Sequence, residues 1–163
     1  MRKRILLLLA VPLLLCGCER EALTDPVLFC EGYNRIAARP IRETDAYLRA
    51  QDEMLLFAGE TLVRLKWNED GAIGTAVVTG TASQETATVA RDAFTVLAQP
   101  FDEDVPSDVI AQCIEPDLSV QTAETKRFYY AVYGDGENVT IVQTNRLLSS
   151  IPVLPSLCPA GSE

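Results

Sequence analysis

The stretch Lys126–Thr144, KRFYYAVYGDGENVTIVQT, decides the fold. Its first half is rich in aromatic side chains, its centre is Gly-Asp-Gly-Glu, and its second half is rich in β-branched residues. An Asp-Gly turn between two runs of this kind is typical of a β-hairpin. The sequence therefore predicts strands over 126–133 and 138–144, and the fold should contain antiparallel sheet.

A second hairpin is predicted earlier in the chain. Thr61–Trp67 alternates between apolar and basic side chains, turn-forming residues fill 68–74, and Thr75–Thr79 reads as the return strand. At 163 residues the chain reads as one domain plus a targeting segment, so both hairpins are expected in that domain.

Four helices are expected around these strands. The first begins at Asp25 and Pro26, an N-cap followed by proline at N1, and ends before Arg39-Pro40. A second is predicted over 41–58, where Tyr47, Leu48, Met54, Leu55 and Ala58 form an apolar stripe. The span 84–99 favours a helix capped by Ser83, although its threonines also suit a strand, and Ser107 is expected to cap a short helix to Cys113. The predicted class is a small single α+β domain whose N-terminal helices pack on antiparallel β-hairpins.

Composition excludes several functions. The 163 residues include 14 basic and 23 acidic side chains, and no histidine. Ser-His-Asp catalysis, Cys-His catalysis and histidine zinc sites all need an imidazole. A formal charge of −9 also disfavours a nucleic-acid-binding surface.

The N-terminus predicts export. Three basic residues, Arg2 to Arg4, precede Ile5–Leu15, an apolar run interrupted only by Pro12. As a helix this run spans roughly 16 Å, about half of a hydrocarbon core, so it fits a signal-peptide h-region rather than a membrane span.

The run ends in Leu15-Cys16-Gly17-Cys18. This resembles the lipobox of bacterial lipoproteins, which has Leu at −3, a small residue at −1 and Cys at +1. The resemblance implies cleavage after Gly17, a diacylglyceryl group on the sulfur of Cys18 and acylation, such as palmitate, of the new amino group. By the same analogy, Glu19 favours the periplasmic face of the outer membrane over the inner membrane.

These features divide the chain into four parts. Residues 1–17 form the cleaved signal peptide, 18–24 a short tether, 25–150 the α+β domain and 151–163 a Pro-rich tail. Cleavage leaves 146 residues with 11 basic and 23 acidic side chains, a formal charge of −12. The tether spans at most roughly 25 Å, so the domain should lie close to its membrane.

Three cysteines remain after the predicted anchor, Cys30, Cys113 and Cys158. Thiols of exported proteins tend to pair, so one disulfide bond and one leftover thiol are expected. A bridge from Cys158 would hold the tail on the domain, and Cys30 and Cys113 are both candidates to receive it.

The aromatic strand offers a candidate partner surface. Phe128, Tyr130 and Val132 should share the core face, which leaves Tyr129 and Tyr133 on the opposite face. If that face is open, the two tyrosines suit a protein partner, with Lys126 and Arg127 beside them. The alternative is that the tyrosines only pack as strand formers.

The sequence predicts no cofactor, metal or catalytic constellation. The acidic loop 101–108 lacks the spacing of a calcium-binding loop, and turn chemistry explains the acidic turns 68–71 and 135–138. The leading hypothesis is a non-catalytic binding or assembly module, anchored by lipid and with an envelope protein as possible partner. The alternatives are a periplasmic enzyme that uses carboxylates or a thiol, and an acidic inhibitor of a basic secreted protein.

Overall fold

The computed structural model describes residues 22–50, 52–114 and 120–148. The helices in this part of the chain are α1 (Pro26–Ile36), α2 (Gln84–Ala98) and α3 (Ser107–Ala111), with short 3₁₀ turns η2 (Glu43–Asp45), η3 (Gln99–Phe101) and η4 (Gln112–Ile114). The strands are β1 (Ala46–Ala50), β2 (Glu53–Ala58), β3 (Thr61–Trp67), β4 (Ile73–Thr81), β5 (Gln121–Glu124), β6 (Phe128–Gly134) and β7 (Asn138–Asn145).

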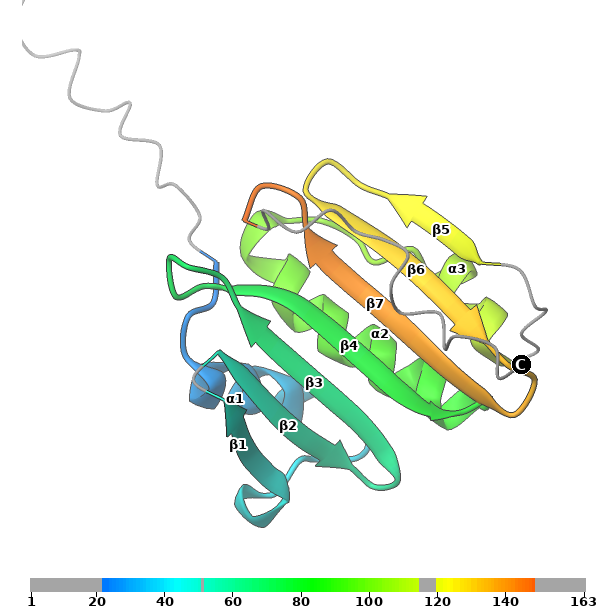
Figure 1. The fold of residues 1–163 in the computed structure, drawn as a ribbon, viewed down its shortest axis with the longest axis horizontal. Helices are drawn as coiled ribbons and strands as arrows, with labels where there is room; N and C mark the ends of the chain where they lie inside the picture. The colour runs from blue at the N-terminus through cyan, green and yellow to red at the C-terminus, as the bar shows by residue number, and fades with distance from the viewer. Residues whose placement is uncertain (1–21, 51, 115–119, 149–163) are drawn as a thin grey trace, which may run out of the picture.

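Seven strands of the described chain form one antiparallel sheet in the order β1-β2-β3-β4-β7-β6-β5. Two meanders, β1–β4 and β5–β7, meet where β4 pairs with β7, and the helices between them cross behind the sheet (Figure 1). All three helices lie on this one face in the figure. The predicted α+β class and single small domain are confirmed at this level.

The core lies between the helices and this face of the sheet. Alternate strand residues point toward the helices and are buried, for example Val63 and Leu65 on β3 and Ile141 on β7. Phe94 of α2 is fully buried against them, and its ring lies 6.0 Å from that of Tyr130. The opposite face, here called the outer face, carries Leu55, Phe57, Leu62, Val77, Val142, Tyr129 and Tyr133.

The first helix forms as predicted. The Asp25 side chain accepts a hydrogen bond of 2.8 Å from the Val27 N–H, and Pro26 opens the helix. Gly32 allows close packing on α2, because a Cβ there would lie 3.0 Å from Val96 Cγ1. After α1 the chain turns back, and the Asn34 side chain in the last turn of the helix bonds both the N–H and the carbonyl of Ile41.

The helix predicted over 41–58 is wrong, since this span forms η2, β1 and β2. The apolar run at 54–58 serves both faces of the sheet: Met54 and Leu56 face the helices, whereas Leu55 and Phe57 lie on the outer face. A strand that is apolar on both faces loses the alternation that marks strands, so its pattern can be read as a helix.

The two predicted caps have different outcomes. Ser83 caps α2 as predicted, because its Oγ accepts a hydrogen bond of 3.2 Å from the Thr86 N–H. Ser107 does not cap α3: it is the first helical residue, and Pro106 occupies the cap position without a side-chain bond. The predicted hairpin is confirmed as β6 and β7, with Gly136 at a φ of 97° in its turn.

The end of the predicted tether belongs to the domain. The Leu23 carbonyl accepts a hydrogen bond of 2.8 Å from the Ile73 N–H, and the Thr24 carbonyl accepts one of 2.8 Å from Trp67 Nε1. Leu23 also packs against the core. The signal peptide, Cys18 and the tail over 151–163 lie outside the described residues.

Candidate functional site

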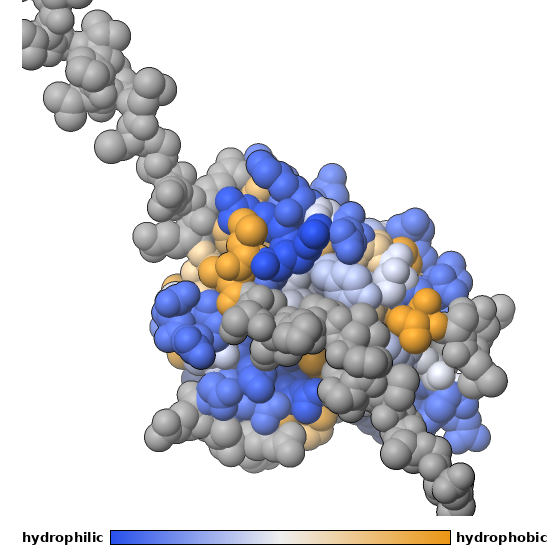
Figure 2. Space-filling model, turned by 45° about the horizontal axis from the view of Figure 1, so that its top comes forward, coloured by the Kyte–Doolittle hydropathy of each residue, from blue (hydrophilic) through white to orange (hydrophobic). Residues whose placement is uncertain are grey.

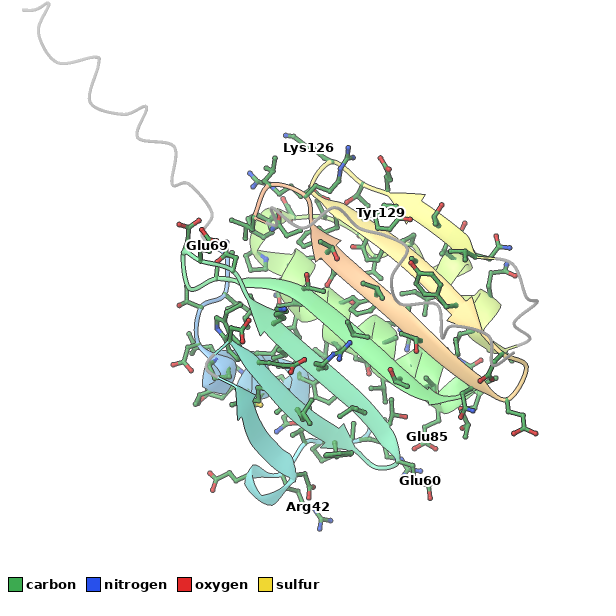
Figure 3. The ribbon with its side chains drawn as sticks, in the orientation of Figure 1. Arg42, Glu60, Glu69, Glu85, Lys126 and Tyr129 are labelled. Atoms are coloured by element: carbon green, nitrogen blue, oxygen red, sulfur yellow. The ribbon has the colours of Figure 1, made fainter. Side chains whose placement is uncertain are left out.

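The division of β6 into two faces is as predicted. Phe128, Tyr130 and Val132 are at most 2 % exposed on the core side, whereas Tyr129 and Tyr133 are half-buried on the outer face. Figure 3 shows Tyr129 on this strand.

The two tyrosines do not form one aromatic cluster. In the register, Tyr129 lies beside Thr144 of β7 and Tyr133 beside Thr140. Four residues of extended strand separate them, or roughly 13 Å. Tyr129 therefore lies between Glu124 and Thr144. The row between the two tyrosines is apolar and buried, with Ala131 opposite Val142 and Val142 opposite Val77.

The basic residues expected beside the tyrosines turn elsewhere. The Arg127 guanidinium lies 4.5 Å from the centroid of the Phe101 ring, a cation–π contact, and the Phe101 ring itself contacts core-facing Phe128. The Arg127 N–H donates to Glu103 Oε2 at 3.2 Å. Lys126 is exposed at the turn before β6 (Figure 3). The structure thus does not bring Arg127 onto the face with Tyr129.

Two hollows flank the β3–β4 turn. The sequence did not predict these hollows. The larger has a volume of about 520 Å³, and its walls include Lys66, Trp67, Asp70 and Leu147. The smaller, of about 280 Å³, is walled partly by Pro26 and again by Trp67. The chain's only tryptophan therefore lines both hollows, and its position at a strand end before an acidic turn was the signal available in the sequence.

The acidic turns are built as turns. Asp135 Oδ1 accepts hydrogen bonds from the N–H groups of Glu137 and Asn138, and these bonds hold the pKa of Asp135 below its usual value. Asn68 Oδ1 accepts one from Ala72 in the same way. Across the residues that the structure describes, no three Asp, Glu, Cys or His side chains are grouped to hold a metal ion.

Cys30 and Cys113 carry free thiols and lie far apart. Cys30 is on α1, which reaches α2 near Val96, whereas Cys113 Sγ lies 4.0 Å from the Ser83 carbonyl at the start of α2. Thirteen residues of helix separate these points, or roughly 20 Å, and disulfide bonding needs Cα atoms within about 7 Å. These two cysteines therefore do not pair with each other, and the predicted bridge from Cys158 involves a residue outside the described ones.

Neither thiol is set up as a nucleophile. Burial raises the pKa of Cys113 to about 11, and burial together with the nearby Asp25 carboxylate raises that of Cys30. A reactive cysteine needs the opposite shift, toward the thiolate. Among carboxylates, burial raises the pKa of Asp92, but this side chain lies between α1 and α2 rather than in either hollow.

The comparisons give no family to this chain: no protein-family model, no curated protein and no solved structure matches it. Within the described residues, no helix combines the length and the apolar character needed to cross a bilayer.

Proposed function

We propose that this protein is a bacterial lipoprotein, attached through Cys18 to the periplasmic face of the outer membrane, whose domain is a non-catalytic binding or assembly module. The attachment rests on the lipobox-like residues 15–18 and the signal-peptide pattern before them. Two or more acyl chains hold a protein stably on a bilayer, and one alone does not.

One structural observation carries the proposal beyond the signal peptide. Leu23 and Thr24 are already bound to the domain by hydrogen bonds to Ile73 and Trp67. Only five residue steps then separate Cys18 from Leu23, a reach of roughly 18 Å when extended. A domain on so short a tether acts at its own membrane, which suits assembly at the envelope better than capture of distant substrates.

The chemistry of the described residues supports binding rather than catalysis. The two thiols have raised pKa values, and the one carboxyl with a raised pKa is packed between helices. The outer face instead carries Tyr129 and Tyr133, on a strand whose opposite side is buried in the core. We assign the partner surface to these two tyrosines, with exposed Lys126 at its edge.

The anchor is tested with Cys18→Ala and a matched control, Cys16→Ala. Radiolabelled palmitate and membrane fractionation should show the label and the membrane association lost in Cys18→Ala and kept in Cys16→Ala. The anchor is falsified if Cys18→Ala keeps both, or if Cys16→Ala alone loses them.

The same membranes test the partner surface. Cross-linking of the lipid-anchored protein, read by mass spectrometry, should recover an envelope protein near one-to-one. Recovery should fall when Tyr129 and Tyr133 become alanine and stay unchanged for Glu137→Ala in the exposed β6–β7 turn. Equal recovery from all variants would move the partner surface off the outer face.

A further inference from the structure

We infer that one end of the domain lies flat against the phospholipid surface, with Val27, Leu28 and Leu147 in contact with the lipid headgroups. This end, here called the tether end, comprises the start of α1, the β3–β4 turn and the turn after β7. The inference rests on the proposed lipid anchor and adds the orientation of the domain and the surface that meets lipid.

The path of the chain fixes which end is near the membrane. The Leu23–Ile73 and Thr24–Trp67 hydrogen bonds hold the incoming chain at the β3–β4 turn. The turn after β7 lies at the same end, because the Asn68 side chain donates to the Leu148 carbonyl at 3.0 Å. The opposite end of β4 is roughly 27 Å further away along the strand, beyond the roughly 18 Å that the chain from Cys18 to Leu23 spans when extended.

Three exposed large apolar side chains lie at this end, whereas the other four of the described chain, Ile36, Phe57, Ile114 and Val120, lie away from it. Val27 is 59 %, Leu28 50 % and Leu147 67 % exposed, and they include the most exposed large hydrophobic residues of the described chain. Figure 2, in which this end comes forward, shows hydrophobic side chains beside charged ones close to where the described chain begins. Apolar side chains on a helix start and a turn can enter the boundary between headgroups and acyl chains, where their contact with water is relieved.

The charges indicate an apolar rather than an electrostatic contact. Lys126 and Arg146 lie at the tether end, but Glu69 and Asp70 of the β3–β4 turn offset them (Figure 3). The opposite end, where Figure 3 labels Glu60 and Glu85, also carries basic side chains, because Arg39 pairs with Glu85 at 3.3 Å. The contact is therefore expected on phosphatidylcholine and should need no anionic lipid.

The fluorescence of Trp67 can measure how close the tether end lies to the lipid. It is the only tryptophan, it lies at the tether end, and it walls both hollows there. The lipidated full-length protein is placed in phosphatidylcholine vesicles with and without bromine atoms near the headgroup end of the acyl chains. Bromine quenches only nearby indoles, so Trp67 fluorescence should fall in the brominated vesicles.

Two variants make the result specific. A double variant, Trp67→Phe with Glu137→Trp, moves the reporter to the exposed turn at the opposite end and should show no quenching. A triple variant, Val27→Ser, Leu28→Ser and Leu147→Ser, changes exposed side chains only and should reduce the quenching of Trp67 while leaving the circular dichroism spectrum unchanged.

The outcomes separate this inference from the proposed function. Vesicle-bound, lipidated protein with unquenched Trp67, or with equal quenching at both ends, would overturn the orientation and leave the anchor intact. Quenching that the triple serine variant does not change would overturn the assigned contact residues. A mature chain that carries no lipid and stays off the vesicles would overturn the anchor, and the orientation with it.

Discussion

Tyr33 and Tyr130 are both fully buried, but their hydroxyl groups have different surroundings. Tyr130 Oη accepts a hydrogen bond of 3.0 Å from Gln143 Nε2, which also donates to the Phe94 carbonyl at 3.3 Å. The Tyr33 hydroxyl has no hydrogen-bond partner among the residues that the structure describes, and burial, with the nearby Asp92 charge, raises its pKa. A buried polar group is stabilising only when it is paired, so the two hydroxyls should contribute with opposite signs.

Phenylalanine substitutions measure this difference. Tyr130→Phe should lower the free energy of unfolding by about 1 kcal/mol, because the buried Gln143 amide loses a partner. Tyr33→Phe removes an unpaired hydroxyl and should leave the protein equally stable or more stable. Urea unfolding of the two variants side by side gives both values, and a larger loss for Tyr33→Phe would reveal a bond that the hydroxyl makes in solution.

At the level of single residues, the sequence predicted one part of the candidate site and missed another. Strict alternation in β6 was enough to place Tyr129 and Tyr133 on the face opposite Tyr130, since a strand's side chains alternate by geometry alone. The direction of Arg127 could not be predicted, because its partner Phe101 comes from η3, after α2, and only tertiary packing brings the two together.

Among the elements, α2 connects the two meanders, and its first turn depends on Ser83. The Ser83 side chain accepts from the Thr86 N–H, one of the donors that a helix start leaves without a backbone partner. Ser107 stands at the start of α3 but bonds only the Val105 carbonyl, at 3.4 Å, and caps nothing.

Alanine at these two serines should therefore give different results. Ser83→Ala should cost about 1 kcal/mol of unfolding free energy, the usual effect of losing an N-cap. Ser107→Ala, an identical change at an exposed position, should have a much smaller effect. Thermal unfolding followed by circular dichroism compares them, and equal losses would mean that the cap of α2 contributes nothing of its own.

Elements were predictable where local chemistry and tertiary role agree. The hairpin β6–β7 has its Asp-Gly turn and β-branched strand, and α1 has its Asp-Pro start. In contrast, β2 is apolar on both faces, a pattern that also fits a helix, while β5 is the polar edge strand Gln-Thr-Ala-Glu, whose composition favours no strand. Both are strands because neighbouring strands pair with them.

At the scale of the whole molecule, the tether end gathers segments far apart in the sequence. Asp52, Trp67 and Leu147 wall one hollow, yet they come from the start of β2, the end of β3 and the turn after β7. No local sequence pattern indicates that these residues lie together, so the hollows could not be predicted from the sequence.

The packing of α1 on α2 links the stability of the whole domain to pH. Asp92 of α2 is 9 % exposed and faces Tyr33 of α1. Burial raises the pKa of Asp92 above the ordinary value of an aspartate, and Arg91, whose Nε lies 3.6 Å from the carboxylate, opposes that shift only in part. A carboxyl whose pKa is higher in the folded state binds protons more tightly there, so its charged form destabilises the fold.

Asp92→Asn should therefore raise the free energy of unfolding at pH 7, where Asp92 is charged and its full penalty is present. The advantage should shrink as pH falls through the pKa of Asp92 in the folded state, and it should vanish below the unfolded value near 4. Urea unfolding of both proteins across this pH range isolates the effect, because every other titrating group is common to the two. An asparagine variant less stable at pH 7 would show instead that the contact with Arg91, which lies next to Asp92 on the same helix, outweighs the cost of burying the charge.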